Sequence, residues 1–198
     1  MIKLLFGLLI ASHFFSQFIV VSRRLHLKKI ILASALAFAG ISGSAQANNF
    51  NYNFFEVRTA IGPEMTGVEF STFFTENSHF ILRADSQFDK DYDLAGGIGF
   101  NGPISQFADV YGQLLLHQVK FTQEAGGESE TQAEVNVGVR LWLTDQVEAT
   151  ARLGRNDDSS VAHAGVRFHS TQQLSLSAET RNNGLYGPQI TMSVRFQY

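Results

Sequence analysis

The chain has 198 residues, a formal net charge of −3, 18 phenylalanines and no cysteine. This length allows one domain or a small pair, and the lack of cysteine excludes a disulfide scaffold, a cysteine-ligated zinc site and a thiol nucleophile. With 44% hydrophobic and 17% charged residues, the chain is too apolar to be disordered. Its slightly negative charge argues against nucleic-acid binding.

The first 47 residues carry five basic side chains and no acidic one. Lys28 and Lys29 precede a short apolar run, 30–40, and the segment ends in Ser44-Ala45-Gln46-Ala47. A basic start, a short apolar stretch and a small-x-small site are the three parts of a secretory signal peptide. We therefore expect residues 1–47 to be a signal region that is cut after Ala47. Removing its five positive charges leaves residues 48–198 with a formal charge of −8.

A second apolar run, residues 4–21, precedes this signal. It is either a membrane segment or a stretch that lies upstream of the true start of translation. We prefer a start near Leu25 or Leu27 as the simpler hypothesis. N-terminal sequencing of the precursor tests it, because a start at Met1 would exclude it.

Residues 48–198 alternate apolar and polar side chains with a period of two, which predicts strands rather than helices. The alternating segments are 52–61, 67–74, 80–88, 94–101, 107–121, 133–143, 147–155, 161–169, 174–181 and 190–198. Two weak segments could belong to loops, which would leave eight strands. Short turns such as Gly62-Pro63 and Gly102-Pro103 join the segments, and one longer acidic loop covers 122–132. Because an open sheet would expose adhesive edges, we predict an all-β, closed antiparallel up-and-down barrel of about ten strands.

The two faces of the strands differ in charge. The residues that we assign to one face include no charged side chain, and the other face carries seven acids and seven arginines but no lysine. These fourteen residues, which we name the lumen charge network, are Glu56, Arg58, Glu69, Arg83, Asp85, Asp109, Glu134, Arg140, Glu148, Arg152, Arg167, Glu179, Arg181 and Arg195.

Alternation alone fits two opposite proteins: a soluble barrel that is apolar inside and a transmembrane barrel that is apolar outside. Arginine without lysine suits buried, bidentate pairing with carboxylates. Glycines on the charged face, such as Gly99 and Gly165, suit a crowded interior better than a solvated surface. We therefore predict a transmembrane barrel with the charges in its lumen, and a soluble periplasmic barrel is the alternative.

The last strand alternates apolar residues and ends in Phe196-Gln197-Tyr198. It resembles the C-terminal strand of bacterial outer-membrane β-barrels, and residues 48–198 resemble the small OmpA/OmpX-type and porin-like barrels of that class. The resemblance implies a monomer in the bacterial outer membrane, in contact with membrane lipid and lipopolysaccharide. It also implies that Phe196 and Tyr198 are the signal for the barrel-assembly machinery, and that the N-terminus is periplasmic.

With that orientation, aromatic residues collect at the periplasmic rim, which is typical of a girdle at the membrane interface. The predicted girdle consists of Phe54, Phe55, Phe74, Phe80, Phe100, Phe107, Trp142, Phe168, Phe196 and Tyr198. Acidic residues gather instead in the predicted outer loops, among them Asp89, Asp91 and Asp93. We expect these loops to be solvated; the alternative is that they bridge to lipopolysaccharide phosphates through divalent cations.

The charges of the lumen decide the predicted function. Balanced numbers of arginines and carboxylates predict internal pairing that closes a narrow lumen, since unpaired buried charges are costly. We therefore predict a non-enzymatic barrel with a structural or surface-interaction role, without a cofactor and without a metal site. A narrow porin for small solutes is the first alternative.

A lipid A-modifying enzyme is the second alternative, because some outer-membrane barrels carry catalytic sites near their outer end. The candidate set is His163 with Asp157, Asp158 and Ser159, which could activate a hydroxyl nucleophile. However, the His-Ser motif of deacylase-type barrels is replaced here by Glu179-Thr180-Arg181-Asn182. We therefore predict no catalytic residue.

The other histidines do not suggest catalysis. His169-Ser170 falls at the predicted periplasmic turn, which is the wrong end of the barrel for such a site. We expect His79 and His117 to be structural.

Overall fold

A computed structural model describes residues 50–87, 91–120 and 129–198. The predicted signal region 1–47, its cleavage site and most of the loop 122–132 lie outside the described residues. No helix in the described part is long and apolar enough to cross a membrane.

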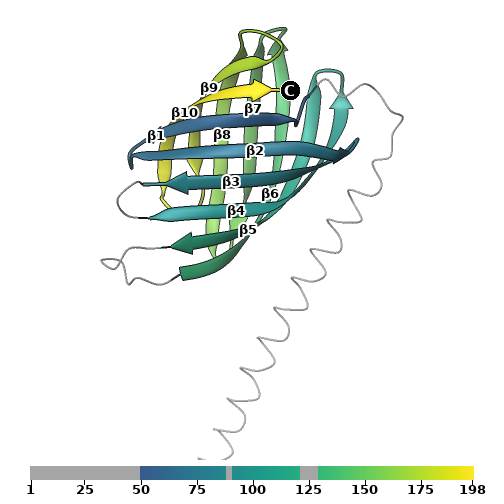
Figure 1. Ribbon diagram of the computed structural model, residues 1–198. Coiled ribbons are helices and arrows are strands. Elements are labelled where there is room, and N and C mark those ends of the chain that lie inside the picture. The colour runs from purple at the N-terminus through teal and green to yellow at the C-terminus, as the bar shows by residue number, and fades with distance from the viewer. Residues whose placement is uncertain (1–49, 88–90, 121–128) are drawn as a thin grey trace, which may run out of the picture. The chain divides into compact units, whose positions relative to one another are not determined.

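Ten antiparallel strands form the described part, and each pairs with its neighbour in the sequence (Figure 1). They are β1 (Phe54–Ile61), β2 (Met65–Thr75), β3 (Ser78–Ser86), β4 (Tyr92–Ser105), β5 (Ala108–Lys120), β6 (Ser129–Thr144), β7 (Val147–Asn156), β8 (Ser159–His169), β9 (Leu174–Asn182) and β10 (Pro188–Gln197). β1 also pairs with β10, from Phe54 opposite Gln197 to Ile61 opposite Ile190, so the sheet closes. The predicted closed barrel is confirmed, with ten strands rather than eight.

Closure places both ends of the described chain at one end of the barrel, which we name the terminal end. The turns after β2, β4, β6 and β8 lie at this end as well, because the strands alternate in direction. The connections after β1, β3, β5, β7 and β9 lie at the opposite end, which we name the loop end.

The predicted turn at Gly102-Pro103 is wrong. β4 continues through both residues to Ser105, and Pro103 stands opposite Asp109 on β5. The register shifts between Pro103 and Ser105, and such an irregularity tolerates a proline, which has no N–H to donate to the ladder. The turn itself comes later, at residues 106–107.

Two expected loops are shorter than the composition predicted. β6 begins at Ser129, so residues 129–132 belong to a strand and not to the long acidic loop. Asp93 lies in β4 and is fully buried, so its assignment to a solvated loop is wrong as well. Acidic composition alone cannot distinguish a loop from an inward position near the end of a strand.

Exposure alternates along the strands in the predicted direction. On β3, Leu82 is 59% exposed, whereas the next residue, Arg83, is 3% exposed. On β1, Phe55 and Val57 are exposed while Glu56 and Arg58 are buried. Large apolar side chains therefore cover the outside of the barrel and charged side chains lie within, which is the reverse of a water-soluble barrel.

Eight of the ten residues predicted for the aromatic girdle are exposed on the outside: Phe55, Phe74, Phe80, Phe100, Phe107, Phe168, Phe196 and Tyr198. The prediction is wrong for Phe54 and Trp142, which occupy inward positions of the alternation. The ring of Phe54 lies 3.7 Å from the guanidinium carbon of Arg195, and Trp142 stacks on Phe50 with ring centroids 5.7 Å apart.

The outward face of β1 provides a test of what surrounds the barrel. Val57 lies midway along β1 and Ile61 ends it, and both side chains point outward. In lipid vesicles, we expect Val57→Arg to lower the free energy of unfolding by about 2–4 kcal/mol and Ile61→Arg by about 1 kcal/mol or less, because the cost of a charge depends on membrane depth. Denaturant titration of the folded barrel measures both. Equal, small effects would mean that water and not lipid covers this face.

Candidate functional site

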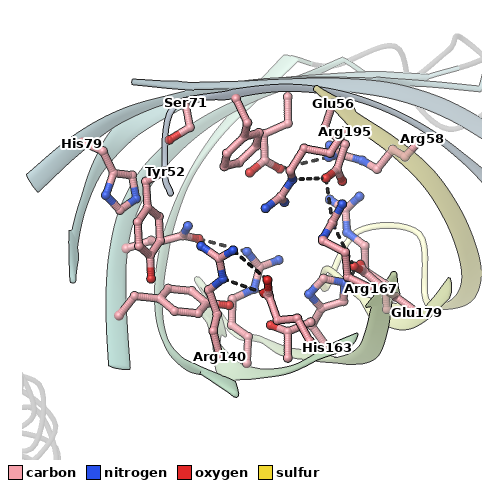
Figure 2. Close-up of a pocket in the computed structure, with 18 residues that line it drawn as sticks. Tyr52, Glu56, Arg58, Ser71, His79, Arg140, His163, Arg167, Glu179 and Arg195 are labelled. Carbon is pink, nitrogen blue, oxygen red and sulfur yellow. Dashed lines mark hydrogen bonds and ion pairs between the residues drawn. The ribbon is translucent and has the colours of Figure 1, made fainter. Parts of the chain in front are cut away.

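The lumen is the candidate functional site, and all fourteen residues of the lumen charge network lie within it. Twelve of them are buried, and the side chains of the other two, Glu69 and Arg195, are each 12% exposed. Figure 2 shows several of these side chains converging from opposite walls of the barrel. With so little water in reach, each charge depends on a protein partner.

Asp85 of β3 joins two arginines. It accepts hydrogen bonds from Arg58 Nη2 at 2.6 Å and from Arg181 Nη2 at 2.9 Å. Arg58 lies two strands away on β1, but Arg181 lies on β9, on the other side of the lumen. Arg58 also donates to Glu69 Oε2 at 2.9 Å. This pairing therefore ties distant parts of the wall together.

Glu56 of β1 is the centre of a second group (Figure 2). Its Oε2 accepts from Arg195 Nε of the neighbouring strand at 2.6 Å and from Arg167 Nη2 of β8 at 2.8 Å. Arg167 also reaches Glu179 Oε1 at 3.4 Å. Because β8 and β1 are three strands apart around the barrel, this bond also spans the lumen.

Arg83 of β3 makes a third link of the same kind. Its Nε donates to Glu69 Oε2 at 2.9 Å, and its Nη1 lies 3.7 Å from Glu134 Oε2 on β6. Two further members of the network bond to uncharged partners: Asp109 accepts from the Tyr52 hydroxyl at 2.8 Å, and Arg152 Nη1 donates to Gln113 Oε1 at 2.9 Å.

The terminal end of the lumen is occupied by residues 50–53, which precede β1. The rings of Phe50 and Tyr52 are buried, and the Arg140 guanidinium carbon lies 5.0 and 4.8 Å from their centroids. Arg140 also holds Glu148 with two parallel bonds, from Nε to Oε1 at 2.6 Å and from Nη2 to Oε2 at 2.9 Å. We name Phe50 and Tyr52 the aromatic plug.

This plug was not predicted from the sequence, although a signal for it exists. Phe50, Tyr52 and Phe54 continue, with a period of two, the inward register of Glu56 and Arg58. Burial, with the neighbouring Asp109 carboxylate adding to it, raises the pKa of Tyr52 well above its ordinary value. The Tyr52 hydroxyl therefore stays protonated and serves as the donor to Asp109.

The histidines form contacts with lumen carboxylates that were not predicted from the sequence. His117 of β5 is buried between two carboxylates: Nδ1 lies 2.9 Å from Asp93 Oδ2, and Nε2 lies 3.1 Å from Glu134 Oε2. The amide of Asn136 donates to the other oxygen of Glu134. His169 lies 3.1 Å from Glu148 Oε2. His117 therefore bridges two acids inside the lumen, and His169 pairs with one.

The candidate catalytic set around His163 is not assembled. His163 Nε2 lies 2.5 Å from Glu179 Oε2, and it faces the lumen. Asp157 instead accepts a hydrogen bond from the Ala133 backbone N–H at 3.1 Å. Asp158 and Ser159 are exposed in the connection between β7 and β8 and at its edge. Their closeness in sequence does not translate into a shared site, because strand alternation directs these side chains to different places.

A closed barrel with an apolar exterior and an ion-paired interior is an integral β-barrel of the bacterial outer membrane, as the sequence predicted. No known protein family and no curated protein matches the chain.

Several solved structures resemble it in barrel architecture. The KdgM porin is 6% identical, with a TM-score of 0.48, over 73% of this chain and 99% of that one. The NanC porin is 6% identical, with a TM-score of 0.45, over 73% and 98%. The outer membrane protein Omp33 of Acinetobacter baumannii is 8% identical, with a TM-score of 0.41, over 76% and 100%. At these values the resemblance carries no information about a ligand or a role.

Glycine positions make room for the ion pairs. Gly67 of β2 stands directly between Arg58 and Asp85 in the ladder, and a Cβ atom at Gly67 would overlap the Asp85 carboxylate. The two charged side chains can therefore meet above the Gly67 backbone. In the same way, the imidazole of His79 covers Gly99 on the neighbouring strand.

This packing predicts that Gly67→Ala destabilises the barrel by about 3 kcal/mol, because the methyl group displaces one partner of a buried ion pair. Gly96→Ala is the matched control: Gly96 is on an adjacent part of the same sheet, but a Cβ there meets only a Leu82 methyl group at 3.4 Å, and we expect a change within about 1 kcal/mol. Denaturant unfolding in detergent micelles measures both. Similar values for the two variants would contradict this account of the lumen.

Proposed function

We propose that this protein is a non-enzymatic barrel of the outer membrane whose lumen is kept closed by its own ion pairs, with a structural or surface-interaction role. The observation that carries this proposal is the direct bonding of opposite walls. Arg181 of β9 bonds Asp85 of β3 at 2.9 Å, and Arg167 of β8 bonds Glu56 of β1 at 2.8 Å. No solute can pass between two groups at hydrogen-bond distance without separating them.

The space left between these groups supports closure. The cavity lined by Glu56, Arg167 and Arg181 has a volume of about 60 Å³, which holds a few water molecules. The aromatic plug narrows the terminal end further, where Tyr52 stacks on His79 with ring centroids 4.5 Å apart. Separating any of these charge pairs would leave buried charges without partners, which is unfavourable.

The environment of the histidines supports a role without catalysis. His117, His163 and His169 bond carboxylates and His79 lies 3.3 Å from the Asn101 amide oxygen, so each is held by a neighbour. In the described part, no serine or threonine hydroxyl is among these partners. A hydroxyl nucleophile would need such a contact to be activated.

The C-terminal strand carries the proposed assembly signal. Phe196 and Tyr198 point outward from the barrel wall and are 46% and 51% exposed, so both rings are accessible to a partner protein during insertion. Tyr198 stacks on Phe70 with ring centroids 6.1 Å apart and donates to the Ser71 carbonyl at 3.2 Å. We propose that the barrel-assembly machinery recognises these two rings. We further propose that the inserted protein is a monomer surrounded by membrane lipid and lipopolysaccharide.

Conductance distinguishes the closed barrel from a narrow porin. We expect the wild-type protein in planar bilayers to show no current steps above leak. The double variant Asp85→Ala with Arg181→Ala removes one link between the walls together with both of its charges, and we expect it to show small steps. Leu82→Ala with Thr180→Ala, on the outward faces of the same two strands, is the matched control and should stay silent. Regular steps from the wild-type protein would overturn the closed lumen in favour of a porin.

A further inference from the structure

Three basic side chains stand in one row across the inward face of β7, β8 and β9. Arg152 is directly opposite His163 in the ladder, and His163 is directly opposite Arg181. Side chains at such positions lie within contact range, and like charges there repel each other. Glu179 supplies one negative charge to this row, because its Oε2 lies 2.5 Å from His163 Nε2, and the arginines on either side require further negative charge.

The carboxylates of the barrel do not fully supply it. Arg152 is the one lumen arginine that has no carboxylate oxygen within 4.0 Å in the part of the chain that the structure describes, and its bond to Gln113 is to an uncharged group. Arg181 has a single carboxylate partner, Asp85, which it shares with Arg58.

Both arginines also have N–H groups without a partner. Arg152 Nε, Arg181 Nε and Arg181 Nη1 are buried and make no hydrogen bond, while the two residues are only 6% and 4% exposed. Buried donors of this kind are rare in folded proteins, and a charged donor without an acceptor is the costliest case. These donors therefore lack an acceptor among the residues that the structure describes.

The same two residues line the cavity of about 60 Å³ in the lumen. Six arginines line this cavity, and only four carboxylates do: Glu56, Glu69, Glu148 and Glu179. Asp85, Asp109 and Glu134 balance the total charge of the network, but none of them accepts from Arg152 Nε, Arg181 Nε or Arg181 Nη1. A confined, low-dielectric space lined by more arginines than carboxylates concentrates small anions.

We propose that the lumen binds one small monovalent anion of the size of chloride between the guanidinium groups of Arg152 and Arg181, beside His163. A cavity of about 60 Å³ is too small for phosphate esters and for organic acids of more than a few atoms. The anion accepts hydrogen bonds from the donors that have no partner in the chain and separates the two like charges. This site is independent of whether the barrel conducts, because it requires only the cavity and its lining.

Bromide locates the site directly. Crystals of the wild-type barrel soaked in sodium bromide should show an anomalous peak within about 3.5 Å of nitrogen atoms of both Arg152 and Arg181, the range of hydrogen bonds to a large halide. A lumen that shows only water at this place, or bromide only on the outer surface, would overturn the proposal.

Stability in solution tests the same site with variants. The measurement is the temperature at which the folded barrel loses its fast electrophoretic migration. We expect this temperature to be higher in sodium chloride than in sodium gluconate at equal ionic strength. The reason is that an anion that binds only the folded state stabilises that state. Arg152→Gln should reduce the apparent chloride affinity about tenfold or more, as the loss of a charged donor does. Arg155→Gln is the matched control: Arg155 is on the same strand, with its side chain 66% exposed, and the chloride response should be unchanged.

Two outcomes would contradict the site. One is an equal rise in both salts, which would indicate general screening of charge. The other is an Arg152→Gln variant that folds and keeps the wild-type response. If Arg152→Gln does not fold, Arg152→Lys keeps the charge but loses the planar fork, and a chloride affinity equal to that of the wild type would also overturn the proposal.

Discussion

Charge neutralisation in a space without bulk water is the constraint on which this barrel depends. Seven arginines extend from the wall into the lumen, and six of them find a carboxylate within 4.0 Å, several on strands that are three or four positions away around the barrel. Arginine can do this because its planar group donates in several directions at once, so that one residue such as Arg58 or Arg167 joins two acids. The pairs that neutralise the charges are thus also the cross-links that close the lumen.

The apolar exterior follows from the same alternation. A strand that directs every second residue inward directs the others outward, and the outward residues here are valine, leucine and phenylalanine. In hydrocarbon, every backbone N–H and C=O group must find its partner within the protein, and the pairing of β1 with β10 provides this. Closure, an apolar outer surface and an ion-paired interior are therefore three consequences of one sequence pattern in one solvent.

Glycines and aromatic rings shape the part of the lumen that the charged side chains do not fill. At Gly67 the absence of a side chain lets Arg58 and Asp85 meet, and at the terminal end the aromatic plug supplies two rings that cover Arg140. Pairing is incomplete at the row of Arg152, His163 and Arg181, where three guanidinium nitrogens lack an acceptor among the described residues.

The sequence by itself determined the closed barrel, the direction of its faces and the class of protein, because a period of two with the strand charges gathered on one side has few stable solutions for hairpin-linked strands. It also predicted inward glycines in a crowded interior. The choice between eight and ten strands was left to the structure. Only the tertiary structure decided which arginine meets which acid, since the partners of Asp85 and Glu56 come from distant strands and depend on register and closure. The same holds for Asp93 and the aromatic plug: whether a residue near a strand end enters the lumen or the solvent depends on where pairing stops, and local composition does not encode that point.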